Sequence, residues 1–357
     1  MSKKALIVSL KYHPGHYSHL IAYYLLLKEV GYESTLYVNK NFAKLDVDDA
    51  FNKLYKMTWL SYQKFDCVVF LFPSIKNILE IIKFRVFGSA TIFYLFHEPI
   101  ISYKEFYQSG FTGLSLAKLF FIDGVNKLSV TLSNSVILCS LKAFAIYETK
   151  YNLLNSHKLH IPLIFDDENQ SKISINNERI YISYIGTLAT DHAFDKFINY
   201  VEHAVSNDEF MNYKFLIATS SRLDKKLMRR LKSGDIRDRL VIVDGKWLSN
   251  QEINSFYSKS LVVWNAYDRS TQSGVLPKSF MFGTPVLGNY SLPNEYLRQY
   301  KNGIYLNDNS DYVEISEAIE YISTNIEELA ILSRSTFLDS FYYKSYVNLI
   351  NTHINHG

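Results

Sequence analysis

A lysine on the first turn of a predicted helix is the first feature of the sequence that could do chemistry. Ser273, Gly274 and Val275 begin a short helical segment, and Lys278 follows within one turn. The apolar runs LVVWNAY and PVLGN on either side are typical of neighbouring strands in a parallel sheet. Unpaired N–H groups at a helix start bind anions, and a lysine adds a mobile positive charge. The segment therefore predicts a diphosphate site, with a tight turn and a solvated lysine as the structural alternative.

Histidines form a second group of candidate residues. His97 and Glu98 follow the apolar run ATIFYLF, and His16 and His19 lie in the loop that contains Gly15. A histidine at the carboxyl end of a strand can hydrogen-bond a hydroxyl or transfer a proton near neutral pH. Zinc binding would need a fixed geometry and a carboxylate or cysteine nearby, so contacts with a substrate are the better interpretation of the first loop.

Strands alternating with helices must position these residues. Apolar strands are predicted at 4–10, FDCVVFLF, ATIFYLF and SVILCS, and a second series begins with YISYIG at 181–186. The expected helices include residues 48–60 and 106–128. This alternation is typical of a doubly wound α/β fold with parallel sheets.

A polar stretch divides the two series of strands. Residues 166–179, DDENQSKISINNER, contain turn formers without apolar periodicity and predict a linker. A length of 357 residues favours about two domains with a cleft between them. We expect Rossmann-like domains at 1–165 and 180–337, and a last helix at about 338–357 that packs back on the first domain.

The composition excludes several classes of protein. The net charge of +3 arises from 38 basic and 35 acidic residues, a near balance that argues against nucleic-acid binding. Cys67 and Cys139 lie in apolar runs and are predicted to be buried free thiols. The first apolar stretch, ALIVSL, is too short for a signal peptide, and no run approaches the length of a membrane span. We expect a soluble or peripheral cytoplasmic protein.

The order of these motifs resembles the GT-B glycosyltransferases, in particular the retaining branch that carries Glu, seven residues and a second Glu before a Gly-Thr-Pro-Val turn. The turn is present at 283–286, and the resemblance extends over most of the chain through HPGH, YLFHEP, VILCS, YIGTL and LVIVDGKWLSNQEINSFYSKSLVVW. It implies two Rossmann-like domains that face each other across a cleft, with an acceptor held by the first and a nucleotide sugar by the second.

The sequence departs from this family at the residues that hold the donor. The two glutamate positions fall at Ser270 and Lys278, and the loop GTLATDHAF places His192 near the expected lysine and contains no arginine. We therefore expect Lys278 and Arg222 to neutralise the phosphates. For Arg222 the structural alternative is an exposed residue at the start of a helix.

The resemblance also assigns roles to the remaining candidates. Trp247 lies in the loop that holds the nucleotide base in the family and could stack on it, or could simply pack. His97 with Glu98 is predicted to be catalytic, and Gly15, His16 and His19 are predicted to contact the acceptor. The predicted donor site comprises Gly186, Thr187, Arg222, Trp247, Ser270, Ser273, Gly274, Val275 and Lys278.

Two further pairs of residues have a structural explanation. Ser249 and Glu252 have the spacing of a capping box. Asp46 and Asp48 form an Asp-x-Asp pair, a metal-binding signature in the other major glycosyltransferase fold, but they precede a predicted helix. Helix capping is the better account of that pair.

The implied function is transfer of a sugar, of hexosyltransferase type, from a nucleotide-diphosphate donor to a glycan or lipid-linked acceptor in surface polysaccharide assembly of bacterial type. Neither a metal nor a separate cofactor is expected, because helix starts and cations can carry the leaving diphosphate. Retention and inversion both remain open. The alternatives are a sugar-nucleotide 2-epimerase of the same fold and a non-catalytic partner subunit, the latter suggested by Ser270 and Lys278.

A segment of the first domain has the composition of a membrane-surface helix. Residues 114–130, LSLAKLFFIDGVNKLSV, could lay an apolar edge on a bilayer, whereas a helix facing the core is the alternative. Such contact would place the protein on the inner face of the cytoplasmic membrane, which suits a lipid-linked acceptor.

Overall fold

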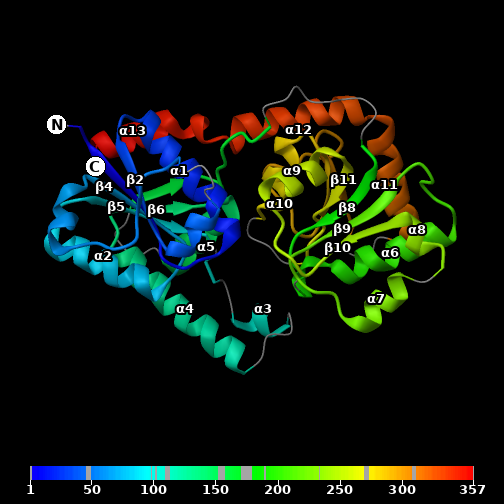
Figure 1. Ribbon diagram of the computed structural model, residues 1–357, viewed down its shortest axis with the longest axis horizontal. Coiled ribbons are helices and arrows are strands. Elements are labelled where there is room, and N and C mark those ends of the chain that lie inside the picture. The colour runs from blue at the N-terminus through cyan, green and yellow to red at the C-terminus, as the bar shows by residue number, and fades with distance from the viewer. Residues whose placement is uncertain are drawn as a thin grey trace. The chain divides into compact units, whose positions relative to one another are not determined.

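The computed structural model describes residues 2–45, 50–97, 99–100, 103–108, 113–151, 157–169, 179–188, 190–232, 234–268, 273–307 and 311–356. The chain divides into two compact units. Unit 1 contains residues 1–166 and 340–357, and unit 2 contains residues 167–339. Each unit has its own parallel sheet with helices around it, as expected for two Rossmann-like α/β domains (Figure 1).

Unit 1 is built on a seven-stranded sheet with the order β3-β2-β1-β4-β5-β6-β7. Its strands are β1 (Lys4–Ser9), β2 (Glu33–Val38), β3 (Lys53–Leu54), β4 (Cys67–Leu71), β5 (Thr91–Phe96), β6 (Ser135–Leu138) and β7 (His157–His160). All neighbouring pairs are parallel. The central strands are apolar and buried, as strands covered on both faces must be, and the free thiols of Cys67 and Cys139 are buried as predicted.

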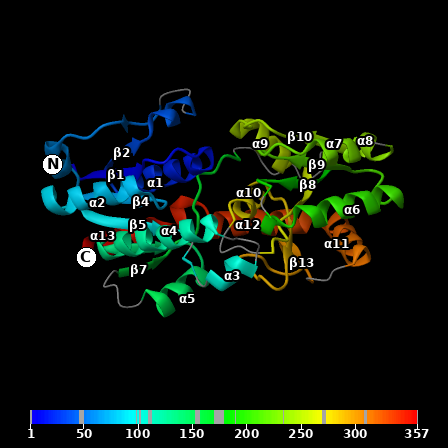
Figure 2. The same cartoon turned by 90° about the horizontal axis from the view of Figure 1, so that it is seen from below.

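Helices and short 3-10 turns cover this sheet (Figure 2). They are η1 (Pro14–His16), α1 (Tyr17–Glu29), η2 (Lys40–Lys44), η3 (Trp59–Lys64), α2 (Ile75–Phe87), α3 (Tyr103–Gln108), α4 (Leu114–Thr131), α5 (Leu141–Lys150), η5 (Tyr343–Tyr346) and α13 (Val347–His356). Side chains of α2, α4 and α5 enter one core cluster with the sheet, whereas α13 packs beside α1. The Nε2 atom of His353 on α13 lies 2.8 Å from the hydroxyl of Ser135, so the end of the chain is bonded to unit 1.

Unit 2 has a six-stranded parallel sheet with the order β10-β9-β8-β11-β12-β13. Its strands are β8 (Tyr181–Ile185), β9 (Lys214–Ala218), β10 (Leu240–Val243), β11 (Ser260–Trp264), β12 (Val286–Asn289) and β13 (Gly303–Leu306). Its helices are η4 (Thr190–His192), α6 (Phe194–Ser206), α7 (Lys225–Leu231), α8 (Ile236–Arg239), α9 (Asn250–Ser258), α10 (Val275–Met281), α11 (Tyr312–Thr324) and α12 (Ile326–Ser340). The strand order reverses between β8 and β11, which is the position where ligands bind in such sheets.

The secondary structure of unit 1 differs from the sequence-based prediction in two segments. The helix predicted at 48–60 is wrong, because this segment contains the strand β3, which pairs with β2, followed by η3. The edge of β2 offers backbone partners to the segment: the amide of Leu36 donates to the carbonyl of Asn52. The single helix expected at 106–128 is two helices, α3 and α4. Asp46 and Asp48 lie outside the described residues, so the capping interpretation of that pair stays a prediction.

The Gly-Thr-Pro-Val turn has a structural role at the amino end of β12. The guanidinium of Arg179 donates to the carbonyls of Phe282 and Gly283 and to the hydroxyl of Thr284, at 2.9–3.2 Å. Gly283 has a φ of 62°, a left-handed conformation that favours glycine. The turn therefore fixes the passage from α10 into β12, at the edge of the sheet opposite to the ligand-binding edge.

Candidate functional site

The predicted donor site begins at Gly186, directly after β8. Its φ of 151° disfavours any residue with a side chain, and a Cβ atom placed there would lie 3.6 Å from both the hydroxyl of Tyr267 and a methyl group of Val275. The loops that follow β8 and β11 and the start of α10 therefore meet at the switch point of the sheet. Of the predicted donor residues, the structure brings Gly186 and Val275 together.

Ser221 ties three loops together at the same edge, and the sequence did not indicate it. Its hydroxyl accepts a hydrogen bond from the backbone N–H of Leu188 at 3.2 Å. Its carbonyl accepts one from the N–H of Gly245 at 3.1 Å. The loops after β8, β9 and β10 are thereby held in a fixed arrangement by one small residue.

Tyr267 is a second residue that sequence reasoning missed. The imidazole of His192 stacks on its ring at 4.2 Å with the planes 5° apart, and the His192 Nδ1 atom lies 2.9 Å from the carbonyl of Thr187. Burial raises the pKa of Tyr267 to about 12, although a hydrogen bond with Ser273 lowers it, so the phenol stays protonated. Thr187 therefore lies in the same cluster, through its backbone.

The start of α10 is less open than predicted. The Val275 N–H donates to the hydroxyl of Ser273 at 3.2 Å, and Gly274 has an ordinary helical conformation. The helix contains only 7 residues, so its dipole is weak. Ser270 lies outside the described residues.

Arg222 and Trp247 lie on the loops after β9 and β10. Arg222 is exposed, its stem lies against Gly245, and its guanidinium forms no ion pair with any residue that the structure describes. Trp247 is 61% exposed. Next to it, the predicted capping box is confirmed: the hydroxyl of Ser249 accepts from the Glu252 N–H at 3.2 Å, and the Glu252 carboxylate accepts from the Ser249 N–H at 2.8 Å.

Lys278 is not the mobile charge that the sequence suggested. It is 9% exposed, and its Nζ atom lies 2.7 Å from a carboxylate oxygen of Glu168 and 3.2 Å from the side-chain oxygen of Asn254. The side-chain amide of Asn254 donates to the same Glu168 oxygen at 2.8 Å. A buried ammonium needs a counter-charge, and Glu168 provides it from the segment that follows unit 1 in the chain. Lys278 thus joins α10 to α9 and to this segment.

In unit 1, four aromatic side chains gather at the carboxyl ends of β1, β4 and β5. His16 stacks on Phe72 at 3.6 Å, and His97 lies with its ring centre 5.8 Å from that of Phe72. His13 lies 4.8 Å from His16, and Gly15 leaves room for it, since a Cβ atom at Gly15 would come within 3.2 Å of the His13 ring. The structure therefore brings His16 and His97 together at this edge of the sheet. Glu98 lies outside the described residues.

His16 and His19 differ in their environments. The Nδ1 atom of His16 is buried and has no hydrogen-bond partner among the described residues, and burial, with neighbouring histidines, lowers the pKa of His16 to about 2. His16 is therefore a neutral imidazole at physiological pH. His19 is 6% exposed, and its Nδ1 atom lies 3.0 Å from the carbonyl of Ile164. This favours a packing role for His19 over the expected acceptor contact.

Neither unit shows a metal centre within its described residues, where no group of three or more His, Cys, Asp or Glu side chains is arranged to hold an ion. In unit 1 the chemistry on offer is hydrogen bonding by the neutral imidazole of His16. In unit 2 it is a glycine-lined edge with an exposed arginine and an exposed indole.

The sequence of unit 2 matches a known family. Residues 179–325 match the model of the family Glycosyl transferases group 1. No curated protein matches the sequence significantly.

Solved structures resemble the chain over nearly its whole length. HepE of Anabaena, solved with UDP and glucose, has a TM-score of 0.71 at 12% identity, with 99% of this chain and 100% of that chain covered. Sucrose-phosphate synthase from Thermosynechococcus elongatus has a TM-score of 0.68 at 12% identity, with 99% and 98% covered. WaaG, a glycosyltransferase involved in lipopolysaccharide biosynthesis, has a TM-score of 0.60 at 11% identity, with 99% and 100% covered.

Identities this low establish a common fold and not a common substrate. The strand orders of both sheets and the full-length coverage confirm the resemblance to GT-B glycosyltransferases. The chain has the GT-B fold, and its second unit carries the sequence pattern of the group 1 glycosyltransferases.

Proposed function

We propose that the protein is a glycosyltransferase that moves a sugar from a nucleoside-diphosphate sugar, bound by unit 2, to an acceptor bound by unit 1. The observation that carries this proposal is the edge of the unit 2 sheet, where Gly186 lies against Tyr267 and Val275 and Ser221 ties the adjacent loops. A glycine without a side chain permits close approach of the backbone to a ligand. HepE structures with UDP, UDP and glucose, and UDP-glucose make uridine nucleotides the first donors to test.

In this proposal Arg222 replaces the phosphate contact that Lys278 was expected to make. Its exposed guanidinium has no ion pair among the described residues, whereas the ammonium of Lys278 is paired with Glu168. A guanidinium also matches the geometry of phosphate oxygens better than an ammonium does. The exposed ring of Trp247 on the neighbouring loop is the proposed platform for the base.

His97 is the proposed sugar or acceptor contact, together with His16. Both rings adjoin Phe72 at the carboxyl edge of the unit 1 sheet, where ligands bind in folds of this type. A neutral imidazole has one acceptor nitrogen, so it can accept a hydrogen bond from a hydroxyl and hold it in position during transfer, whereas an imidazolium can only donate. We propose hexosyl transfer that needs neither a metal nor a separate cofactor, because Arg222 and backbone N–H groups would stabilise the leaving diphosphate.

The experiment that tests the proposal is a donor panel. UDP, GDP, dTDP and CMP sugars are incubated with the full chain, and release of the nucleotide is measured with and without added glycan or lipid-linked acceptors and with EDTA present. Release from one donor that depends on an acceptor and survives EDTA supports the proposal. Conversion of a donor into its 2-epimer without an acceptor would instead identify an epimerase.

A non-catalytic partner subunit is the second candidate. It is favoured by one observation, the Lys278–Glu168 pair at a position where the resembled family carries a carboxylate for the donor. This candidate predicts that the protein binds no donor in the panel, alone or with acceptors. Nucleotide binding in a thermal-shift measurement would exclude a fully decayed site.

We also propose that the acceptor is presented at a membrane, as in surface polysaccharide assembly. The evidence is the α2–α4 surface, which we define as the outward faces of these two neighbouring helices (Figure 1). Its exposed apolar side chains are Ile75, Leu79, Ile82 and Val86 on α2, and Leu114, Phe120, Phe121 and Leu128 on α4. The α2 residues follow the spacing of one helix stripe, while Ile78, Ile81 and Phe84 on the opposite face enter the core.

Basic residues lie on both helices of the α2–α4 surface. Lys76 and Lys83 lie on α2, and Lys118 and Lys127 lie on α4. Lys83 is paired with Glu80 and Lys127 with Asp123, but both lysine side chains remain about half exposed. An apolar stripe with lysines on the same helix is suited to the interface of an anionic bilayer. No helix in the described part of the chain has the length and hydropathy to cross a membrane.

Flotation with anionic liposomes tests the membrane proposal. Val86→Glu should reduce co-flotation of the full chain at low salt, because it puts a negative charge into the stripe. Val313→Glu is the matched control, since Val86 and Val313 are 66% and 60% exposed and both lie on helices. Equal flotation of both variants, or none by the unmodified chain, would refute the membrane contact without affecting the donor site.

A further inference from the structure

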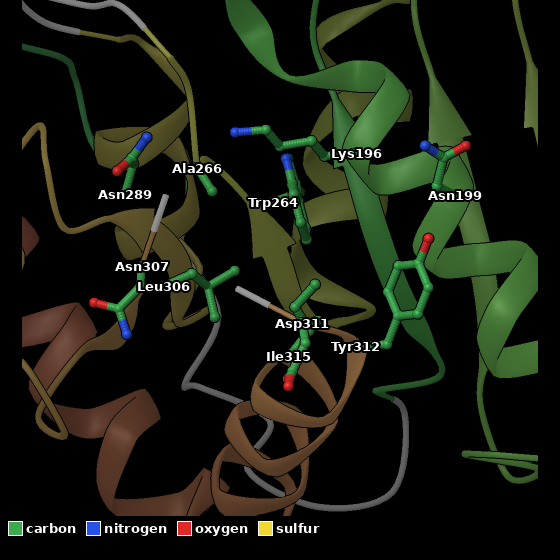
Figure 3. A pocket seen from close by; sticks show the side chains of 10 residues that line it. All are labelled: Lys196, Asn199, Trp264, Ala266, Asn289, Leu306, Asn307, Asp311, Tyr312 and Ile315. Atoms are coloured by element: carbon green, nitrogen blue, oxygen red, sulfur yellow. The ribbon is translucent and has the colours of Figure 1, made fainter. Parts of the chain in front are cut away.

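A hollow of about 310 Å³ opens in unit 2 between α6 and the start of α11 (Figure 3). The charged groups that line it are compensated within the unit. The ammonium of Lys196 lies 2.8 Å from the carboxylate of Asp268, and the carboxylate of Asp311 caps α11. We therefore place no ligand in this hollow. The proposed function leaves a different group of charged side chains without a role, and these are buried in unit 1.

Asp123 on α4 is the centre of a buried ionic network in unit 1. It is only 3% exposed. One of its carboxylate oxygens lies 3.2 Å from the ammonium groups of both Lys127 and Lys150. The same oxygen accepts from the hydroxyl of Tyr103 at 3.3 Å, and the other oxygen accepts from the hydroxyl of Tyr151. The network therefore joins α4 to the start of α3 and to the end of α5.

Two members of this network hold the backbone of Ile100, which lies three residues after His97 in the loop that follows β5. The ammonium of Lys150 donates to the Ile100 carbonyl at 2.8 Å. The hydroxyl oxygen of Tyr151 accepts a hydrogen bond from the backbone of Ile100. Ile100 is 3% exposed, so these bonds take the place of bonds to water that a surface loop would make.

The strand end before His97 is attached to the same tyrosine. Phe96, the last residue of β5, lies edge-on to the ring of Tyr151, with ring centres 5.1 Å apart and planes at 81°. His97 is therefore flanked in the chain by Phe96 and Ile100, and Tyr151 contacts both of them. The backbone on either side of His97 is thus fixed where the imidazole adjoins Phe72.

Ionic bonds buried in this way are not needed for stability alone, since apolar side chains that fill the same space are often equally stabilising. Directional hydrogen bonds do what apolar packing does not, because they fix a backbone at one position. We propose that Lys150 and Tyr151, anchored by Asp123, are positioning residues that hold the loop after β5 so that the His97 ring stays at the carboxyl edge of the sheet. This role rests on the proposed function, in which His97 contacts the sugar or the acceptor.

NMR of the unliganded full chain with ¹³C-labelled histidine tests the positioning. The His97 ring signal is identified among those of the 10 histidines by its loss in His97→Gln. Lys150→Met and the control Lys127→Met each remove one ammonium 3.2 Å from the same Asp123 oxygen, but Lys150→Met also removes the bond to the Ile100 carbonyl. Lys150→Met should therefore shift or broaden the His97 signal, and Lys127→Met should leave it in place. An unmoved His97 signal in Lys150→Met, or an equal change in both variants, overturns the proposal.

Tyr151→Phe breaks the other bond to the same loop. It keeps the ring against Phe96 but removes the hydroxyl that binds Ile100, so it should also move the His97 signal. The signal of His203, which lies on α6 in unit 2, should stay in place in every variant as a check that the chain folds. If either Lys150→Met or Tyr151→Phe does not fold, the other decides the test.

Turnover separates positioning from a general loss of stability. With the donor and acceptor that the donor panel identifies, Lys150→Met should lower kcat roughly 10- to 100-fold, the range for a misplaced reacting group, and leave the Kd for UDP unchanged. In a His97→Ala background the same substitution should cause no further loss, because no ring is left to position. An equal loss in both backgrounds would overturn the proposal. A chain that turns over no donor would refute the proposed function, whereas the NMR comparison would still decide whether the network positions His97.

Discussion

The imidazole of His16 lies flat against the ring of Phe72, with ring centres 3.6 Å apart and planes 14° apart. Phe72 has a φ of 63°, which is unfavourable for a residue with a bulky side chain. The side-chain amide of Asn77 donates to its carbonyl at 2.8 Å and supports this conformation. Backbone strain that the fold stabilises in this way is common at ligand sites, and here it aims an aromatic ring at two histidines.

The first prediction is a pH dependence of stability that arises from His16. Its pKa is lowered in the folded state to about 2, so the unfolded chain binds more protons between that value and the ordinary value of 6.5. The free energy of unfolding is therefore highest above pH 6.5 and decreases as the pH is lowered. His16 contributes at most about 1.4 kcal/mol to this decrease for each pH unit. His16→Phe should reduce the slope of unfolding free energy between pH 7 and 5, measured by urea denaturation.

Part of that slope will remain in His16→Phe. The pKa values of His13 and His353 are also lowered, mainly by burial, and act in the same direction. A slope that does not change at all in the variant would show that His16 is protonated equally in the folded and unfolded chain.

The second prediction concerns Lys278 and Glu168. Lys278→Met leaves the partly buried carboxylate of Glu168 without its counter-charge. Glu168→Gln likewise leaves the ammonium of Lys278 without its own. Each should lower the free energy of unfolding by about 1–3 kcal/mol, and the double variant should lose less than the sum. A double-mutant cycle by chemical denaturation measures this coupling; additive losses would mean that the 2.7 Å pair contributes nothing.

The third prediction concerns the buried Asp123 in unit 1. Burial raises its pKa, but hydrogen bonds from Tyr151 and Lys150 and the charges of Lys150 and Lys127 outweigh it, so the net pKa is lowered. The resulting stability is present above the ordinary carboxyl value and is lost as the pH falls below about 4. Asp123→Asn should lower the free energy of unfolding by about 2 kcal/mol at pH 7. It should also reduce the loss of stability on acidification, which is the acid limb of the curve of stability against pH. An acid limb identical to that of the unmodified chain would contradict the assignment.

The fourth prediction uses two glycines. Gly186→Ala should lower the free energy of unfolding by about 1–3 kcal/mol, because the φ of 151° at this position is unfavourable for alanine. It should also weaken nucleotide binding. Gly124→Ala is the matched control: it lies within α4 with nothing near the added Cβ, and should stabilise by about 0.5–1 kcal/mol. Thermal unfolding and calorimetry check both, and a harmless Gly186→Ala would show that backbone approach there is unimportant.

The sequence predicted the architecture well because both sheets are built from apolar runs separated by helices. Runs such as FDCVVFLF are unmistakable, and they form β4 and the other central strands. The short edge strand β3 was mistaken for a helix, since two residues that pair with β2 leave little periodicity to detect. The local hydrophobic pattern is enough to predict long buried strands. A short strand at the edge of a sheet forms only through pairing with residues that are distant in the sequence, so the local pattern does not predict it.

The positions of the candidate residues in the fold could be predicted only where these residues follow strand order. His97 and Gly186 lie at the ends of strands, and their places in the fold could be expected from topology. Lys278 could not be understood from its own surroundings, because its partner Glu168 lies 110 positions earlier in the sequence. Ser221 and Tyr267 act through hydrogen bonds and stacking between loops, which leave no pattern in the chain.

The most direct test of the account is calorimetric titration of UDP into the full chain and into Arg222→Gln and Arg237→Gln. Both arginines are exposed residues of unit 2 without an ion pair among the described residues, but only Arg222 lies at the proposed phosphate site. Arg222→Gln should weaken UDP binding roughly 10- to 100-fold, the range for a lost charge-assisted contact, and Arg237→Gln should leave it unchanged. No binding of UDP by the unmodified chain, or equal affinity in all three proteins, would contradict a nucleotide site at this edge of the sheet.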